Sequence, residues 1–309
     1  MLDFHSASGE ERLQAYRNVH DVWGRNLSMD AHLHRRLASP THNRARWFVG
    51  CLDTRVVVSL ACYDLEFYLL GGRAAGIAIG SVHTRPEYRR RGYARSLLSW
   101  VEEKERGRGA RRSALYTDID PGYYVQLGYL ACPAWRGQLD PRTVTNSEPG
   151  SASLSPVSLI GESATVAALY DIEHSRYPIA IARDTDYWEY LSRKDVDDTH
   201  YFLQHIDGER LGYVRLRPDR HGVDMADWAL GNPSDEFLGC LLDSVIHLAR
   251  GRGLTSVGGW LPNTPAVRDR FALQARTAET PMLKSLDHRR KLGPDVIEAA
   301  QHFRWVDHV

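Results

Sequence analysis

The stretch that most limits how this chain can fold is RPEYRRRGYARSLL, residues 85–98. A run rich in β-branched and aromatic residues precedes it over 46–84, and a helical pattern follows, in which Ala94, Leu97, Leu98 and Val101 recur on one face. The stretch is therefore predicted to be a turn between a strand and the start of a helix. Three arginines and a glycine in such a turn favour either a basic surface for nucleic acid or a site for a single phosphate group.

The net charge of the chain favours the phosphate site. Its 309 residues contain 39 Lys+Arg and 39 Asp+Glu, so the formal net charge is zero, whereas general nucleic-acid binders usually carry a basic excess. The first amides of a helix have no internal partner, and the helix dipole adds positive charge there. Gly92 lets the backbone approach a ligand closely, and the three arginines add forked donors. We therefore expect no nucleic-acid partner and a phosphate or pyrophosphate at this turn.

Cysteine spacing and hydropathy limit the other classes. The four cysteines Cys51, Cys62, Cys132 and Cys240 include no CxxC pair, which gives no support for a zinc or redox site. The N-terminal stretch lacks the pattern of a signal peptide, and no segment approaches the roughly 20 apolar residues of a membrane span. We expect a cytoplasmic protein with no metal and no membrane partner.

The order of predicted elements indicates two α/β domains. Residues 46–84 read as three strands joined by turns at 53–54 and 71–72; a helix from 93, a strand over 112–119, a short helix over 121–127 and a strand over 129–135 follow. The polar stretch 145–158 is the predicted linker. The second half repeats the order: helices start near 93 and 235, and strands near 113 and 255, with both pairs 142 residues apart. The predicted domains are 1–145 and 155–309.

Two motifs resemble those of a known family. SVHTRPEYRRRGYARSLL contains Arg89-x-x-Gly92-x-Ala94 and resembles the acyl-CoA motif (R/Q)xxGx(G/A) of the GNAT superfamily of N-acyltransferases. YYVQLGY, residues 123–129, resembles the family's FYxxLGF. Tandem GNAT enzymes have the same two-domain layout. The resemblance implies an α/β fold with mixed sheets, an N-terminal catalytic domain and a degenerate C-terminal copy.

The resemblance also implies a site. Val82 and Thr84 are expected to lie along the pantetheine of acetyl-CoA, the co-substrate. The pyrophosphate is expected to contact the residues of the turn, namely Arg89, Arg90, Arg91, Gly92, Tyr93 and Ala94. Tyr124 matches the family's general acid, which protonates the departing thiolate; a phenol, with a usual pKa of about 10, is a suitable neutral donor.

The general base is left open. The family often uses a glutamate on the fourth strand, but AAGIAIGSVHT carries no carboxylate. His83 in that stretch, and Asp64 and Glu66 on the preceding strand, are alternatives. The resemblance to Eis-type acetyltransferases adds the C-terminal tail, through Asp307, His308 or the terminal carboxylate of Val309.

The second half is expected not to bind CoA. At the position of the arginine turn it reads GNPSDEF, where Asp235 and Glu236 suit a helix N-terminus but repel a pyrophosphate. We expect it to help form the acceptor pocket. The predicted function is acetyl transfer from acetyl-CoA to a primary amine, with Asp64 and Glu66 favouring a small cationic molecule. The alternatives are acetylation of a protein lysine or N-terminus, and a non-catalytic CoA- or ligand-sensing module; an oligomer is possible in each case.

Overall fold

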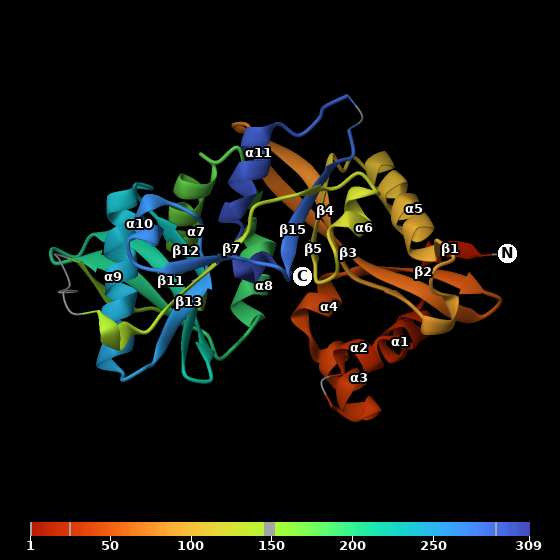
Figure 1. Cartoon of the computed structure of the whole chain (residues 1–309), viewed down its shortest axis with the longest axis horizontal. Coiled ribbons are helices and arrows are strands. Elements are labelled where there is room, and N and C mark those ends of the chain that lie inside the picture. Colours follow the sequence, from red (N-terminus) through yellow and green to blue (C-terminus); the bar gives the residue numbers. More distant parts are fainter. Residues whose placement is uncertain (1, 25, 145–151, 288) are drawn as a thin grey trace.

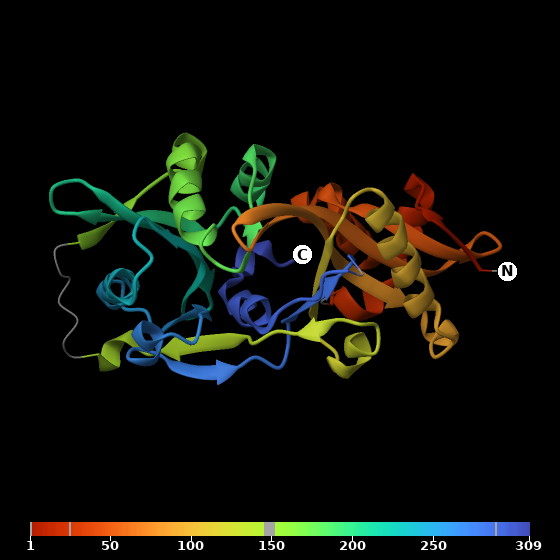
Figure 2. The same ribbon diagram turned by 90° about the horizontal axis from the view of Figure 1, so that it is seen from above.

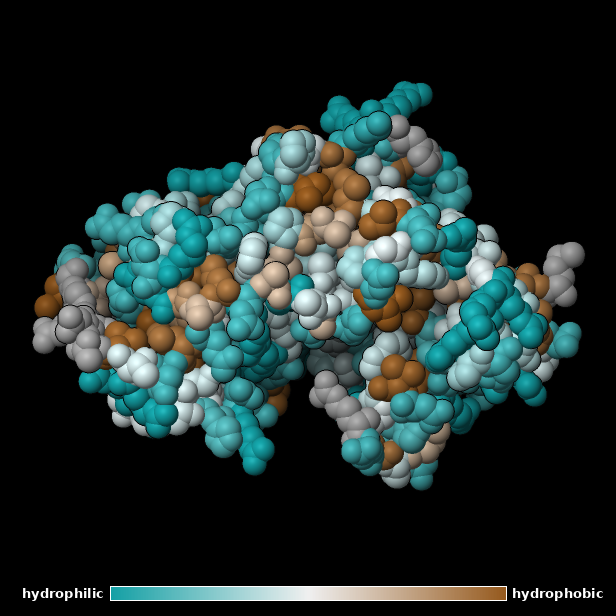
Figure 3. Space-filling view, in the orientation of Figure 1, coloured by the Kyte–Doolittle hydropathy of each residue, from teal (hydrophilic) through white to brown (hydrophobic). Residues whose placement is uncertain are grey.

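Two β-sheets lie side by side along the long axis of the molecule, and helices cover both (Figure 1). The computed structural model describes residues 2–24, 26–144, 152–287 and 289–309. The C-terminal end lies near the centre, between the sheets, and the N-terminal end lies at one extremity (Figure 1). The space-filling view shows a notch between the second-sheet lobe and the helices below the first sheet (Figure 3). We call the parts around the first and second sheets the first and second domains.

The first sheet contains the three strands predicted over 46–84. Its order is β1 (Asp3–Ser6), β2 (Arg46–Leu52), β3 (Arg55–Leu69), β4 (Gly72–Thr84), β5 (Arg112–Thr117), β15 (Thr280–Ser285) and β6 (Leu130–Ala131), with β9 (Ile179–Ala182) also paired to β3. All pairs are antiparallel except β4–β5. The predicted hairpin turns are confirmed, and Asp53 and Gly71 have positive φ there.

Helices cover both faces of the first sheet. One face carries α1 (Gly9–Asn18), α2 (His20–Trp23), α3 (Met29–Ala38) and α4 (Pro40–Arg44); the other carries α5 (Tyr93–Gly107), with η1 (Pro86–Tyr88) and α6 (Gly122–Val125) nearby. Because neighbouring residues of a strand face opposite ways, Ile77 and Ile79 of β4 pack in the cluster of α5, whereas Ala78 packs in the cluster of α1. The core is thus split by the sheet.

The second sheet has the same kind of mixed pairing. Its order is β14 (Ala272–Ala275), β7 (Trp135–Leu139), β13 (Ser256–Trp260), β12 (Gly222–Leu230), β11 (Arg210–Asp219), β10 (Thr199–His205) and β8 (Ala152–Pro156). The only parallel pair among the described strands of this sheet is β12–β13. The remaining elements are η2 (Pro141–Thr143), α7 (Leu159–His174), α8 (Thr185–Arg193), α9 (Asp235–Gly251), α10 (Pro265–Arg268), α11 (Pro294–Ala299), η3 (Ala300–His302) and η4 (Trp305–Asp307).

The predicted repeat is visible in the structure. The first domain runs β3–β4–α5–β5 and the second runs β11–β12–α9–β13. In each case an antiparallel hairpin leads into a helix that returns to a parallel strand, and the second strand of the motif, β4 or β12, carries a β-bulge. The fold is therefore a tandem of two mixed α/β domains.

The two domains exchange strands. After β6 the chain crosses to the second sheet, where β7 pairs with β13 and β14, and β15 later returns to pair with β5 and β6 (Figure 2). The sheets therefore do not divide the chain at the expected limits 1–145 and 155–309. The single strand predicted over 129–135 is two strands, β6 and β7, which belong to different sheets.

One further sequence prediction needs adjustment. The predicted linker, 145–158, lies outside the described residues over 145–151, and the part after it forms β8. Farther along the chain, the short α10 is followed by β14, which adds an edge strand to the second sheet. Of the helices that the structure describes, none has the length and apolar character needed to cross a membrane.

Candidate functional site

The arginine turn holds the start of α5 open toward solvent. Arg90 and Gly92 both have positive φ, 62° and 78°, so the chain turns sharply into the helix. Gly92 is the N-cap, and no side chain from the described residues caps the first amides of α5. These N–H groups and the helix dipole therefore face whatever binds at the turn.

The positive charge of the turn is not neutralised. The Arg89 side chain donates from Nε to the Thr84 carbonyl at 3.1 Å, and Arg91 donates to the Glu87 carbonyl at 3.3 Å. The Glu87 carboxylate pairs with Arg85 instead, at 2.7 Å. Within the described chain, no carboxylate forms an ion pair with the three arginines at 89–91. The turn thus has positive charge and uncapped amides that an anion could contact.

A cavity of about 360 Å³ connects this turn to Tyr124. Its lining is Val82, Thr84, Tyr88, Arg89, Arg90, Gly92, Tyr93, Ala94, Arg95, Ile119, Tyr123 and Tyr124. The structure therefore brings eight of the nine predicted site residues together around one cavity. Arg91 does not line it, because its guanidinium lies over the Tyr88 ring, 5.5 Å from the centroid.

The strands beside this cavity separate where the cavity begins. Parallel pairing between β4 and β5 ends at Ile79 and Leu115, although β4 continues to Thr84. Beyond that point β4 carries a bulge, with Ser81 at a φ of 50°. Backbone groups of β4 that β5 leaves unpaired are available to an extended ligand, which is the arrangement expected for pantetheine.

Tyr124 is a buried phenol at the end of this cavity. It lies on α6, and its ring contacts those of Tyr123 and Tyr129 edge-on, at 5.0 and 5.9 Å between centroids. Burial, assisted by Tyr123 and Asp118, raises its pKa to about 12. The hydroxyl is therefore protonated at neutral pH and is available as a donor.

None of the candidate bases is among the residues that line the cavity. His83 is buried on the opposite side of β4, beside Trp23, and burial together with Arg89 and Arg85 lowers its pKa to about 4. Asp64 forms an ion pair with Arg46, and Glu66 with Arg73. Since both carboxylates already have cationic partners, they give no support for a cationic acceptor.

The C-terminal tail reaches the first sheet. A Cβ on Gly80 of β4 would meet the Val309 carbonyl oxygen at 3.1 Å, so the last residue lies directly against the strand. Asp307 is almost fully buried, where Arg183 and the Tyr187 hydroxyl bind its carboxylate. Lys194 donates to the Val306 and His308 carbonyls at 2.8 and 2.9 Å. Asp307 thus anchors the tail, and Val309 is the tail candidate that contacts β4.

The structure also places Tyr116, Trp260 and Arg276, which the sequence did not single out, near this point. They surround His308, the third tail candidate, and burial lowers the pKa of His308 to about 3. Tyr116 of β5 contacts the rings of His308 and Trp260, at 5.0 and 5.5 Å, and His308 contacts Trp260 at 5.7 Å. The Arg276 guanidinium lies over Trp260, 3.5 Å from the ring centroid. These residues come from both domains and from distant parts of the chain, so no local pattern could identify them.

In the second domain, side chains occupy both the helix N-terminus and the strand edge that are uncovered in the first domain. The α9 N-terminus is capped by Ser234, whose hydroxyl accepts from the Phe237 amide. Beyond the end of the β12–β13 pairing, Arg304 donates to the Trp228 carbonyl and stacks on its ring at 3.5 Å. The structure is consistent with the expectation that this half does not bind CoA at its helix start.

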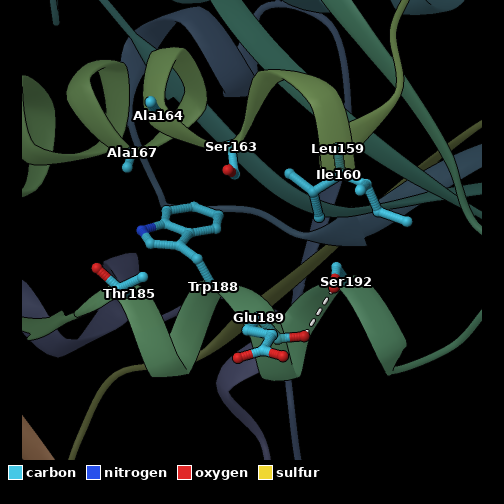
Figure 4. A pocket seen from close by; sticks show the side chains of 9 residues that line it. All are labelled: Leu159, Ile160, Ser163, Ala164, Ala167, Thr185, Trp188, Glu189 and Ser192. Carbon is cyan, nitrogen blue, oxygen red and sulfur yellow. Dashed lines mark hydrogen bonds between the residues drawn. The ribbon is translucent and has the colours of Figure 1, made fainter.

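A different cavity in the second domain does not resemble a pyrophosphate site. It has a volume of about 360 Å³ and lies between α7 and α8, where Trp188 points toward α7 (Figure 4). Its other lining residues are Leu159, Ile160, Ser163, Ala164, Ala167, Thr185, Glu189 and Ser192. The only charged side chain in this lining is Glu189, so the lining offers no cation to a phosphate.

Sequence comparison identifies the first domain. Residues 3–132 match a family described as an acetyltransferase (GNAT) domain. No curated protein matches the chain.

Solved structures share the two-domain fold. A GCN5-related N-acetyltransferase from Kribbella flavida has a TM-score of 0.71 and 18% identity, over 93% of this chain and 72% of that chain. Eis1 from Mycobacterium abscessus has a TM-score of 0.66 and 16% identity, over 93% of this chain and 74% of that chain. A tandem GNAT protein from the clavulanic acid biosynthesis pathway has a TM-score of 0.55 and 15% identity, over 93% of this chain and 99% of that chain. At these identities the similarity concerns the fold alone.

Proposed function

Since the chain belongs to the GNAT superfamily, we propose that it transfers an acetyl group from acetyl-CoA to a primary amine. The observation that carries the proposal is the cavity of about 360 Å³ that joins the arginine turn to Tyr124. Bare helix amides and unpaired arginines at one end suit a pyrophosphate, and the unpaired edge of β4 suits pantetheine. Acetyl-CoA supplies the acyl group as a thioester.

The proposed reaction is direct attack in a ternary complex. The amine nitrogen attacks the thioester carbonyl carbon, the new C–N bond forms and the C–S bond breaks. Backbone N–H groups at the β4 bulge polarise the carbonyl oxygen. Tyr124 gives its hydroxyl proton to the departing thiolate, since its raised pKa keeps it protonated beforehand.

The amine must lose a proton, and the Val309 carboxylate is the candidate general base best placed to take it. Its oxygen lies beside Gly80, at the start of the β4 bulge. His83 is a poor base because its pKa of about 4 leaves it little affinity for a proton. Asp64 and Glu66 lie elsewhere on β3 and form ion pairs with arginines of the neighbouring strands. Asp307 forms an ion pair with Arg183.

The test combines acetyl-CoA titration by calorimetry with a thiol-release assay on a panel of amines. Tyr124→Phe removes the proposed acid but keeps the ring, so we expect kcat to fall about 100-fold while acetyl-CoA affinity stays unchanged. Tyr123→Phe removes a hydroxyl one residue away and is expected to change kcat much less.

The alternative functions predict other results. Binding of acetyl-CoA without turnover of any amine, peptide or protein would favour a non-catalytic sensing module. Turnover confined to lysine-containing peptides or protein N-termini would favour a protein acetyltransferase. If the wild type does not bind acetyl-CoA, the acyltransferase proposal is wrong.

A further inference from the structure

We propose that the acceptor amine also carries a carboxylate, as an α-amino acid does, and that Arg276 binds this carboxylate. The inference rests on the proposed acyltransferase function and specifies its acceptor. It replaces the cationic acceptor that the sequence favoured, because Asp64 and Glu66 form ion pairs with Arg46 and Arg73.

The first observation is a group of buried polar atoms without partners. Arg276 Nε, Arg276 Nη1 and the Tyr116 hydroxyl are all shielded from solvent, and none has a hydrogen-bond partner among the described residues. Buried donors in folded proteins nearly always have an acceptor, and each exception needs an explanation. Nε and Nη2 share one edge of a guanidinium and form the fork that binds a carboxylate through two hydrogen bonds, whereas Nη1 lies on the side of Cδ. A ligand carboxylate on the Nε–Nη2 edge would satisfy Nε.

The two residues belong to one structural unit. Arg276 stacks on Trp260 at 3.5 Å, and Trp260 contacts Tyr116 at 5.5 Å between centroids. Both Arg276 and Tyr116 are only half-buried as whole residues, although these polar atoms are covered. The unit is built by β5 of the first sheet and by β13 and the end of β14 in the second sheet.

This unit lies next to the proposed reaction point. Leu115 is the last residue of β5 that pairs with β4, through Ile79, and Tyr116 and Gly80 follow directly on the two strands. His308 contacts Tyr116 at 5.0 Å, and the next residue, Val309, lies against Gly80. Tyr116 faces away from the α5 side, since Leu115 packs in the cluster of α5. An acceptor with its amine at Gly80 and its carboxylate toward Arg276 would therefore occupy the face opposite α5.

The charges around Arg276 leave it available. Burial lowers its pKa to about 10, so the guanidinium is charged at neutral pH. Glu279 and Asp118 are the nearby carboxylates, but Glu279 forms no hydrogen bond with Arg276, and Asp118 accepts from the Glu279 amide at 3.1 Å. Arg136, the neighbouring cation, pairs with Asp224 at 2.9 Å. A carboxylate at Arg276 thus supplies a partner that the protein does not.

The experiment measures binding and turnover with matched acceptors. Protein saturated with CoA is titrated calorimetrically with pools of α-amino acids and dipeptides, and with the same compounds as C-terminal carboxamides, which keep the amine but lose the negative charge. We expect at least one carboxylate to bind at least tenfold more tightly than its carboxamide, and to be acetylated in preference.

Variants test whether Arg276 is the cause. Arg276→Gln should weaken carboxylate binding at least tenfold and abolish the preference over the carboxamide, with acetyl-CoA affinity unchanged. Arg276→Lys, which keeps the charge without the fork, should retain part of the preference. Arg220→Gln, at the exposed β11–β12 turn, is the matched control and should have no effect.

The outcomes separate this inference from the proposed function. Equal binding of carboxylates and carboxamides, no binding by either set, or a preference that survives in Arg276→Gln would overturn the inference. If acetyl-CoA binds and carboxamides are acetylated as well as carboxylates, the acyltransferase proposal stands and the inference fails. If acetyl-CoA does not bind, both fail.

Discussion

The helices α5 and α9 occupy matching positions in the two domains, yet their first turns have opposite chemistry. The α5 N-cap is Gly92 in a left-handed conformation, preceded by arginines without carboxylate partners. The α9 N-cap is Ser234, whose side chain occupies one amide, and Asp235 and Glu236 follow it. The first amides of α5 are therefore suited to bind a free anion, whereas those of α9 already have partners among the side chains of the helix start itself.

The strands next to the two helices differ in the same way. In the first domain the gap beyond Ile79 and Leu115 adjoins the cavity. In the second domain the corresponding strand, β12, is contacted by η4, and Arg304 covers the Trp228 carbonyl. A repeated backbone therefore offers a ligand site only where neither a cap nor the chain itself fills it. Three predictions test this comparison.

The largest expected effect on stability is from Arg304→Met, which removes the guanidinium that covers the Trp228 carbonyl of β12. Arg304 pairs at 2.8 Å with Glu173, which is almost fully buried. Loss of that partner should destabilise the fold by about 3 kcal/mol, measured by urea unfolding with Arg220→Met as control.

The pH dependence of that effect distinguishes its cause. Burial already raises the pKa of Glu173, and removing Arg304 should raise it further. The folded variant then binds a proton more readily than the unfolded chain, so its deficit should be largest at neutral pH and shrink as pH falls. A deficit independent of pH would attribute the loss to packing on Trp228 instead.

The next effect is from Gly92→Glu, which makes the α5 start resemble that of α9. The left-handed φ strains any side chain, and a carboxylate there repels the pyrophosphate. We expect acetyl-CoA affinity to fall on the order of 100-fold, which is about 2.7 kcal/mol. Gly107→Glu, at the other end of α5 in open space without positive φ, should leave the affinity unchanged. Equal losses in both variants would contradict the comparison.

The smallest effect is from Ser234→Ala, which removes the cap of α9. The loss should cost about 1 kcal/mol of stability, seen as a lower urea midpoint. Acetyl-CoA affinity should not change, because the α9 start is not expected to bind it. A change of more than about threefold in acetyl-CoA Kd would show that the two starts are coupled.

The arginine turn could be predicted because its signal is local. The strand over 72–84, the turn at Arg89–Gly92 and the apolar face of the helix from 93 lie within about 30 residues, and each follows from spacing alone. The structure confirms this strand and helix, and gathers eight of the nine predicted residues around a cavity. Arg91 was the exception, since the direction of a long exposed side chain depends on neighbours such as Tyr88.

The strand exchange and the Arg276 unit could not be predicted, because both depend on pairing between distant segments. Residues 280–285 have no pattern that tells which sheet they join, and β15 pairs with β5 only in the folded chain. Arg276 is a candidate only because it stacks on Trp260, which in turn contacts Tyr116 of the other sheet. Likewise, the sequence offered Asp64 and Glu66 as site carboxylates but gave no sign of their arginine partners.

The exchanged strand β15 has a consequence for the order of synthesis. Its partners on β5 precede it by about 170 residues, so a ribosome has made nearly the whole second half before the first sheet is complete. Until then the edge of β5 beside the reaction point is open to another chain. Acyltransfer competence is thus a late event in the biogenesis of the molecule, and a chain released early, even with every predicted CoA-binding residue, would have an unfinished active domain.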